Sequence, residues 1–202
     1  MSETIKIDFS GLSLPKGGAV VVFVGADLKP GAETAALLGA SMETIAAAAE
    51  TIRFKGTSLT ALDILSPAGL AAARLLVIGV APGKDGKPID FVTLGGFVAG
   101  KLGRGKAATA LFESPGDAWD ASLAADFAFG ARLRTYRFDK YKSKKPDAED
   151  DDSGALSLTV AVANAAEARA AYPRREAVAE GVEFARTLVN EPPNVLYPET
   201  FA

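Results

Sequence analysis

The chain has 202 residues and contains no histidine or cysteine; 49% of its residues are hydrophobic, 23% are charged, and the formal net charge at pH 7 is −3. This composition indicates a folded globular protein of one domain with an appendage, or of two small domains, and excludes a largely disordered chain. The missing residue types exclude disulfides, thiolate and Ser-His-Asp nucleophiles, and histidine-based metal sites.

The segments that direct proteins to membranes are not found in this sequence. The first nine residues, MSETIKIDF, lack the basic and apolar regions of a signal peptide. The longest apolar runs, residues 19–24 and 75–80, are far shorter than the ~20 residues that span a bilayer. The acidic balance gives no general attraction to nucleic acid. We therefore expect a cytoplasmic protein, with neither a membrane nor a nucleic acid as partner.

Strands and a helix alternate in the first third of the chain. Residues 4–9 alternate apolar and polar side chains, the period of a half-buried strand. Residues 19–24, AVVVFV, form a continuous β-branched run, which is typical of a strand covered on both faces. Residues 41–53 predict a helix that Ser41 would cap. Residues 58–65 predict the next strand.

The rest of the body repeats this alternation. Residues 74–80, 107–112 and 157–163 predict strands, and residues 91–102 and 117–136 predict helices. The first of these helices is rich in small residues that would let it pack closely on a sheet: Gly95, Gly96 and Gly100. The second has an apolar inner face: Trp119, Leu123, Phe127, Gly130 and Leu133. Strands alternating with helices imply an α/β layer structure.

The last quarter of the chain changes character. Residues 140–154 are polar and predict a mobile surface loop. An alanine-rich connector, residues 164–172, precedes a helix that Pro173 would begin and that Pro192-Pro193 must end. One apolar stripe runs along this helix: Val178, Val182, Ala185 and Val189. If that stripe packs on a further domain, it would be exposed in this chain.

Two segments of this chain resemble the leucyl (cytosol) aminopeptidase family. Residues 184–202, FARTLVNEPPNVLYPETFA, are similar to the junction where a linker helix of that family enters the metallopeptidase domain. The residues that match by type and spacing are Arg186, Asn190, Pro192, Pro193 and Asn194. Residues 130–145, GARLRTYRFDKYKSKK, resemble a segment of the family's N-terminal domain. The order of predicted elements also agrees with that domain.

The resemblance implies an α/β fold with a macro-domain-like mixed β-sheet flanked by helices in residues 1–163. A connector and a long linker helix in residues 164–202 would then lead to a catalytic domain that lies outside this chain. The full-length parent would be a two-metal aminopeptidase with manganese or zinc, releasing N-terminal residues from peptides, and would assemble as a hexamer. The family's metal-ligand motifs, FDTGG and NTDAEGR, do not occur here. We therefore assign no catalytic, cofactor-binding or metal residue in this chain.

Four other sequence patterns allow both a functional and a structural interpretation. Residues 100–106, GKLGRGK, fit the start of a phosphate-binding loop, but residue 107 is Ala instead of Ser or Thr, and the segment ends a helix where such a loop would begin one. An acidic run could hold a hard cation but is more typical of a solvated loop: Asp147, Glu149, Asp150, Asp151 and Asp152. Trp119, Phe127 and Phe129 are expected in the core.

A basic run could contact phosphates, yet it also suits an exposed helix end whose charge the acidic run offsets: Arg132, Arg134, Arg137, Lys140, Lys142, Lys144 and Lys145. The junction residues Asn190 and Asn194 are expected to cap the helix and set the angle at which the chain leaves it.

Three functions remain open at this point. The first is a non-catalytic N-terminal domain of a leucyl-aminopeptidase-like metallo-exopeptidase, with an assembly and positioning role. The second is a macro-like module that binds ADP-ribose or nucleic acid, although fold alone does not carry function. The third is a stand-alone relative without a peptidase domain.

Overall fold

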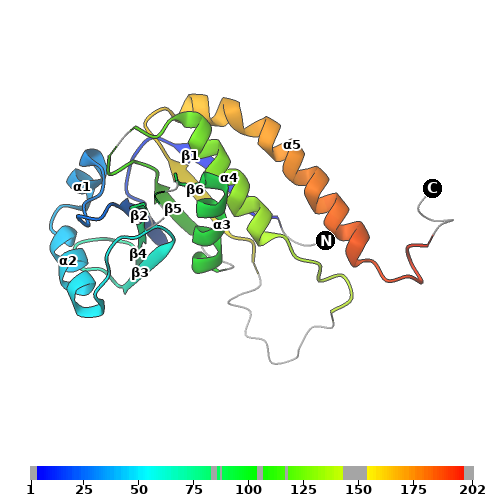
Figure 1. The fold of residues 1–202 in the computed structure, drawn as a ribbon, viewed down its shortest axis with the longest axis horizontal. Helices are drawn as coiled ribbons and strands as arrows, with labels where there is room; N and C mark the ends of the chain where they lie inside the picture. Colours follow the sequence, from blue (N-terminus) through cyan, green and yellow to red (C-terminus); the bar gives the residue numbers. More distant parts are fainter. Residues whose placement is uncertain are drawn as a thin grey trace.

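The structure is a computed structural model that describes residues 4–82, 86, 88–103, 107–116, 118–142 and 154–197. A six-stranded sheet lies at its centre, with strand order β1-β6-β5-β2-β4-β3 (Figure 1). The strands are β1 (Lys6–Ser10), β2 (Ala19–Val24), β3 (Thr60–Leu65), β4 (Arg74–Gly79), β5 (Ala107–Leu111) and β6 (Ser157–Ala161). All neighbouring pairs are parallel except β3 with β4, so the expected mixed α/β sheet is confirmed.

Helices cover both faces of the sheet. They are α1 (Ala32–Leu38), α2 (Ser41–Ile52), α3 (Phe91–Leu102), α4 (Ala121–Thr135) and α5 (Ala165–Asn190). In β2, Val21 and Phe23 contact the core under α3, α4 and α5, whereas Val20 and Val22 contact the core under α1 and α2. Every residue of β2 is buried, as its continuous β-branched run predicts.

The first helical segments differ from the sequence prediction. Helix α1 was not predicted, since its seven residues are too few to show a clear apolar period. Ser41 does not cap α2: the cap position is Ala40, and the buried Ser41 hydroxyl donates to the carbonyl of Ala68 at 2.8 Å. The serine therefore ties the helix start to a neighbouring loop.

The glycines of α3 pack on α4 and not on the sheet, which corrects the prediction. A β-carbon placed on Gly95 would lie 1.9 Å from the carbonyl oxygen of Phe127, and one on Gly130 would lie 1.8 Å from that of Val92. The two backbones can touch there only because both positions lack a side chain. The buried face of α4 is mostly alanine, with Phe127 and Gly130 as predicted and Leu123 and Leu133 only partly buried.

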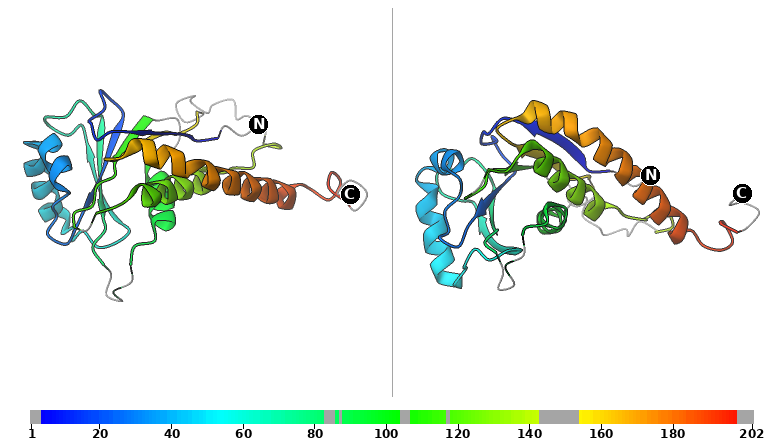
Figure 2. Two further views of the ribbon diagram at one scale, coloured as in Figure 1. Left: turned by 90° about the horizontal axis from the view of Figure 1, so that it is seen from above. Right: turned by 45° about the horizontal axis from the view of Figure 1, so that its top comes forward.

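Helix α5 begins at Ala165, eight positions before the predicted start, so Pro173 lies inside it. Asn164 caps the helix by accepting from the backbone N–H of Glu167, and the alanine-rich connector forms its first two turns. Its 26 residues span roughly 39 Å. Figures 1 and 2 show α5 lying along α4 and extending past the body, so that its last turns are far from α1 and α2.

Candidate functional site

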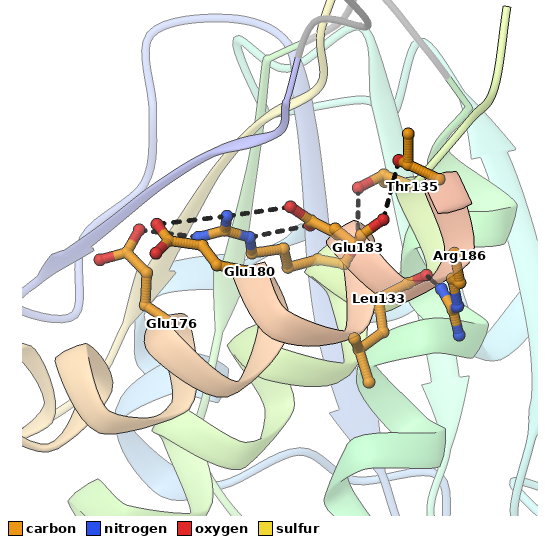
Figure 3. A network of polar contacts seen from close by, with 8 residues as sticks. Leu133, Thr135, Glu176, Glu180, Glu183 and Arg186 are labelled. Carbon is orange, nitrogen blue, oxygen red and sulfur yellow. Dashed lines mark hydrogen bonds and ion pairs between the residues drawn. The ribbon is translucent and has the colours of Figure 1, made fainter. Parts of the chain in front are cut away.

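The face of α5 that contacts α4 is built from charged side chains. Arg132 of α4 is only 7% exposed. Its Nε and one terminal nitrogen donate to both carboxylate oxygens of Glu183, at 3.0 and 3.1 Å, and the other terminal nitrogen donates to Glu176 at 2.9 Å. Glu180 lies 3.7 Å away (Figure 3). Such a two-point contact is strong and directional, and Glu183 raises the pKa of Arg132.

Further polar contacts continue along the same face. Arg175 Nε donates to Asp126 at 2.7 Å, and Arg186 donates to the carbonyl oxygen of Leu133 at 2.7 Å. The Tyr136 and Thr187 hydroxyls lie 3.0 Å apart. Near the helix start, the buried Tyr172 ring packs against Phe9, with ring centres 5.6 Å apart. Helix α5 is therefore docked by these polar contacts together with three buried residues, Ala168, Tyr172 and Ala179.

The apolar side of α5 faces outward. Val178 is 53% exposed, Phe184 65% and Val189 85%, while Gly181 and Ala185 between them are also exposed. The predicted stripe is therefore not the face that docks on the body; among its members only Val182 is half-buried. A surface helix normally turns its charges to water and its apolar side to the core. This inverted orientation marks the outer face of α5 as an interaction surface.

A groove of about 710 Å³ adjoins this outer face. It lies between α5 and the segment that continues from α4, and aromatic side chains with charged neighbours line it, Tyr136, Phe138 and Phe184 among them. Two of its lining residues, Arg137 and Lys140, belong to the basic run, but the sequence did not predict a groove there. The spacing of Glu176, Glu180 and Glu183 in the sequence could have indicated the polar contact with α4, since side chains three and four apart share one helix face.

The crevice where open α/β sheets usually bind ligands is filled by the chain itself. In such sheets a ligand binds at the carboxyl ends of neighbouring strands whose connections run in opposite directions, here β2 and β5. Glu113, just after β5, accepts from the backbone N–H groups of Glu33 and Thr34 at 3.0 and 2.7 Å. Its carboxylate takes the donors that a phosphate would need, which weighs against nucleotide binding there.

The other sequence candidates have structural explanations where they are described. Helix α3 runs through Gly100 and ends at Leu102, with Gly103 in a left-handed conformation after it, so this part of the GKLGRGK segment is a helix end. Residues 104–106 lie outside the described residues, as does the acidic run from Asp147 to Asp152. Trp119 is partly buried and packs edge-on against Phe23 and Phe91 of the core, Phe127 is fully buried, and Phe129 is only partly buried and lies outside the core cluster.

Three members of the basic run are paired with acids of α5, of its C-terminal cap and of their own turn. Arg132 binds glutamates of α5, Lys140 binds Glu191 at 2.8 Å, and Lys142 binds Asp139 at 2.6 Å. Lys144 and Lys145, and the acidic run expected to offset this charge, lie outside the described residues. Arg134 and Arg137 are exposed and make no ion pair within the described residues, so the described part of the run is only partly neutralised.

Of the two junction asparagines, Asn190 contacts a carbonyl at the helix end, whereas the cap position is Glu191 and the role expected of Asn194 stays a prediction. The Asn190 amide donates to the Arg186 carbonyl at 2.7 Å, and the backbone N–H groups of Val195 and Leu196 donate to the carbonyl of Pro192. Within the described ranges, no group of three or more acidic, histidine or cysteine side chains could hold a metal ion. No helix of the described part is long and apolar enough to cross a membrane.

The fold and the inverted helix define a class of protein: an α/β domain with a long helix that exposes an apolar stripe. Residues 19–145 match the model of the cytosol aminopeptidase family, N-terminal domain, and the chain belongs to this family. It is 51% identical to a "Probable cytosol aminopeptidase" of Methylorubrum extorquens and 45% identical to one of Rhodopseudomonas palustris. Each match covers 100% of this chain and 40% of the relative, so the chain spans about 40% of the length of these curated relatives.

Solved structures show the same fold. A mutant of tomato leucine aminopeptidase superposes with a TM-score of 0.75 at 20% identity, covering 100% of this chain and 41% of that one. The bottromycin maturation enzyme BotP in complex with Mn superposes with a TM-score of 0.63 at 21% identity, covering 91% of this chain and 34% of that one. At these identities the likeness concerns the fold alone.

Proposed function

We propose that this chain is the non-catalytic N-terminal domain of a leucyl-aminopeptidase-like metallo-exopeptidase, and that it positions and assembles the enzyme. Residues 1–163 would be the body, and residues 164–202 the connector and linker helix to the catalytic domain. The family match and the length of the relatives support this division of labour. The parent would release N-terminal residues from peptides in the cytoplasm.

The chemistry would belong to the part of the parent that lies beyond this chain. Two divalent ions, manganese or zinc, would there polarise the scissile carbonyl and activate a water. The residues described here do not fit such a centre, because they offer no cluster of acidic ligands. We therefore route no catalytic step through this domain.

The observation that carries the proposal is the inverted polarity of α5. Arg132 and Asp126 of α4 satisfy its charged side, and the exposed apolar residues take no part in holding the helix. That apolar side, with Val178, Phe184 and Val189, remains for the catalytic domain of the same parent chain. Neighbouring subunits of a homo-oligomer, a hexamer in our expectation, would be further partners; membranes and nucleic acids would not.

The first test is enzymatic. The purified 202-residue chain is incubated with a leucyl chromogenic substrate and added Mn²⁺ or Zn²⁺, with a full-length cytosol aminopeptidase as positive control. We expect no hydrolysis above the blank. Hydrolysis by the pure chain would refute the non-catalytic assignment.

The second test concerns the surface. In the full-length parent, Val178→Lys and Val189→Lys should weaken domain packing and assembly, measured by size-exclusion chromatography with light scattering and by the melting temperature. The matched control is Ile52→Lys, at an equally exposed apolar position on α2, on the opposite face of the sheet. If the α5 variants behave like the control, the outer face of α5 is not the interface.

A further inference from the structure

The last residue of the α5 region is held from two sides by a segment distant in sequence. Glu191 comes directly after the helix and closes it, with its backbone N–H donating to the carbonyls of Thr187 and Leu188. One carboxylate oxygen of Glu191 accepts from Lys140 Nζ at 2.8 Å, and the other accepts from the Tyr141 hydroxyl at 2.5 Å. The Glu191 side chain is only 9% exposed, although it lies at the far end of the molecule.

Lys140 and Tyr141 belong to a strap, which we define as residues 136–142. The strap leaves the end of α4 and lies beside the last turns of α5. Its first residue, Tyr136, contacts Thr187 through the hydroxyl, and the Arg186 guanidinium lies 5.7 Å from the centre of the Tyr136 ring. At its other end, the backbone N–H of Lys142 donates to the carbonyl of Asp139 at 3.2 Å, closing a turn. The strap thus continues the α4 contact beyond the end of α4.

Apart from Glu191, the last turn of α5 is held by the Tyr136–Thr187 hydroxyl contact and by the half-buried Leu188. Val189 is 85% exposed and Asn190 is exposed, so this turn makes no apolar contact with the body comparable to that of Tyr172 at the helix start. Helix ends without such support fray. The hydrogen bonds from Lys140 and Tyr141 keep the pKa of Glu191 below its usual range, so the group is a carboxylate at neutral pH.

The chain immediately after Glu191 is stiff. Pro192 and Pro193 each fix one backbone angle, and a proline also restricts the residue before it. The turn closed by Val195 and Leu196 on the Pro192 carbonyl continues this constraint. A change in the direction of α5 at Glu191 is therefore transmitted to the chain beyond.

We propose that Glu191 is a positioning residue. Its hydrogen bonds from Lys140 and Tyr141 hold the end of α5 against the strap and so set the direction in which the chain leaves the domain. The contact joins groups from two segments about fifty residues apart, and it lies beyond the Tyr136–Thr187 contact, at the residue where the chain leaves the helix. The inference concerns this chain alone and holds whether or not the proposed peptidase function is correct.

The absence of cysteine allows a direct test on the 202-residue protein. Spin labels on cysteines introduced by Glu43→Cys, exposed on α2, and Asn194→Cys, exposed after α5, report the distance between the body and the exit segment by pulsed electron resonance. We expect one narrow distance distribution. Glu191→Gln should make it about twofold wider, because neutralising the carboxylate removes the charge-assisted contact to Lys140.

Two further variants make the outcome decisive. Lys140→Met combined with Tyr141→Phe removes both hydrogen-bond donors to Glu191 and should widen the distance distribution as Glu191→Gln does. Glu180→Gln is the matched control, since its carboxylate is 65% exposed and makes only a 3.7 Å contact, and it should leave the width unchanged. An unchanged width in Glu191→Gln, or equal widening in the Glu180→Gln control, overturns the proposal. Circular dichroism confirms that each variant is folded.

Discussion

Helix α4 makes two helix contacts, and they are built in opposite ways. Against α3 it brings backbone onto backbone, at Gly95 and Gly130, with no room for a methyl group. Against α5 it uses long charged side chains, Arg132 above all, that reach across to glutamates. The first contact is part of the core and tolerates no change of volume. The second holds a helix in place while leaving its apolar side for another partner.

The largest loss of stability is expected from adding one methyl group to the α3–α4 contact. Gly95→Ala places a methyl group against the Phe127 carbonyl, and should cost about 3 kcal/mol of unfolding free energy in urea denaturation. The matched control is Gly181→Ala on the outer face of α5, where nothing lies within 4 Å; it should stabilise by about 0.5–1 kcal/mol. Equal effects at both sites would contradict the close packing.

The next largest effect is expected in the α4–α5 contact. Arg132→Met leaves the partly buried Glu183 without its partner, and should cost about 2 kcal/mol, less than a fully buried pair because the neighbouring glutamates reach solvent. Hydrogen exchange should rise along α5 and stay unchanged in α3. Arg174→Met, on an exposed position of α5, serves as the control and should alter neither quantity. Exchange that rises equally in α3 would show that the two contacts are not separable.

A smaller loss of stability is expected from removing the cap at the start of α3. Asp90 caps this helix by accepting from Val92 N–H at 3.0 Å, and its hydrogen bond to the Thr93 hydroxyl lowers its pKa. Asp90→Ala should cost about 1 kcal/mol at pH 7. Because the folded pKa is depressed, this stability is present above the usual aspartate pKa and is lost as the pH falls through the folded value. Unfolding of both proteins measured from pH 7 to pH 2 tests whether their difference shrinks.

The smallest expected effect on the isolated domain is at the outer face of α5. Val178→Lys should change the free energy of unfolding of the 202-residue chain by less than about 0.5 kcal/mol, since the side chain buries little there. Val21→Lys, at a fully buried position of β2, should prevent folding. A large loss from Val178→Lys in thermal denaturation would mean that the stripe packs on the body after all.

Sequence patterns predict single buried elements well. Strands β2 and β4 and helix α3 were predicted within one residue of their ends, because their apolar runs and bounding glycines are local signals. The resemblance to the aminopeptidase family was confirmed by the family match. The domain division at residue 163 stays a prediction, although the helix that was expected to begin at Pro173 begins at Ala165.

The errors in α5 share one cause. Pro173 is unfavourable inside an isolated helix, at a cost of about 3 kcal/mol, so the sequence favours a start there. The preceding turn nevertheless docks on β1 through Ala168 and Tyr172, and Arg169 binds the carbonyl of Phe9 and the carboxylate of Asp8. Tertiary contacts therefore outweigh the local penalty and extend the helix across the proline.

The sequence by itself determined that the chain is α/β, that its central strands are buried, that the long helix stops before Pro192, and to which family it belongs. Each of these conclusions rests on neighbouring residues or on a short motif. Only the tertiary structure decided which side of α5 faces the body, because charged and apolar stripes are both present on that helix. Arg132, in a different helix, satisfies the glutamates and turns the apolar residues outward. Which partner a helix face meets is set by residues far away along the chain, and periodicity within one segment carries no information about them.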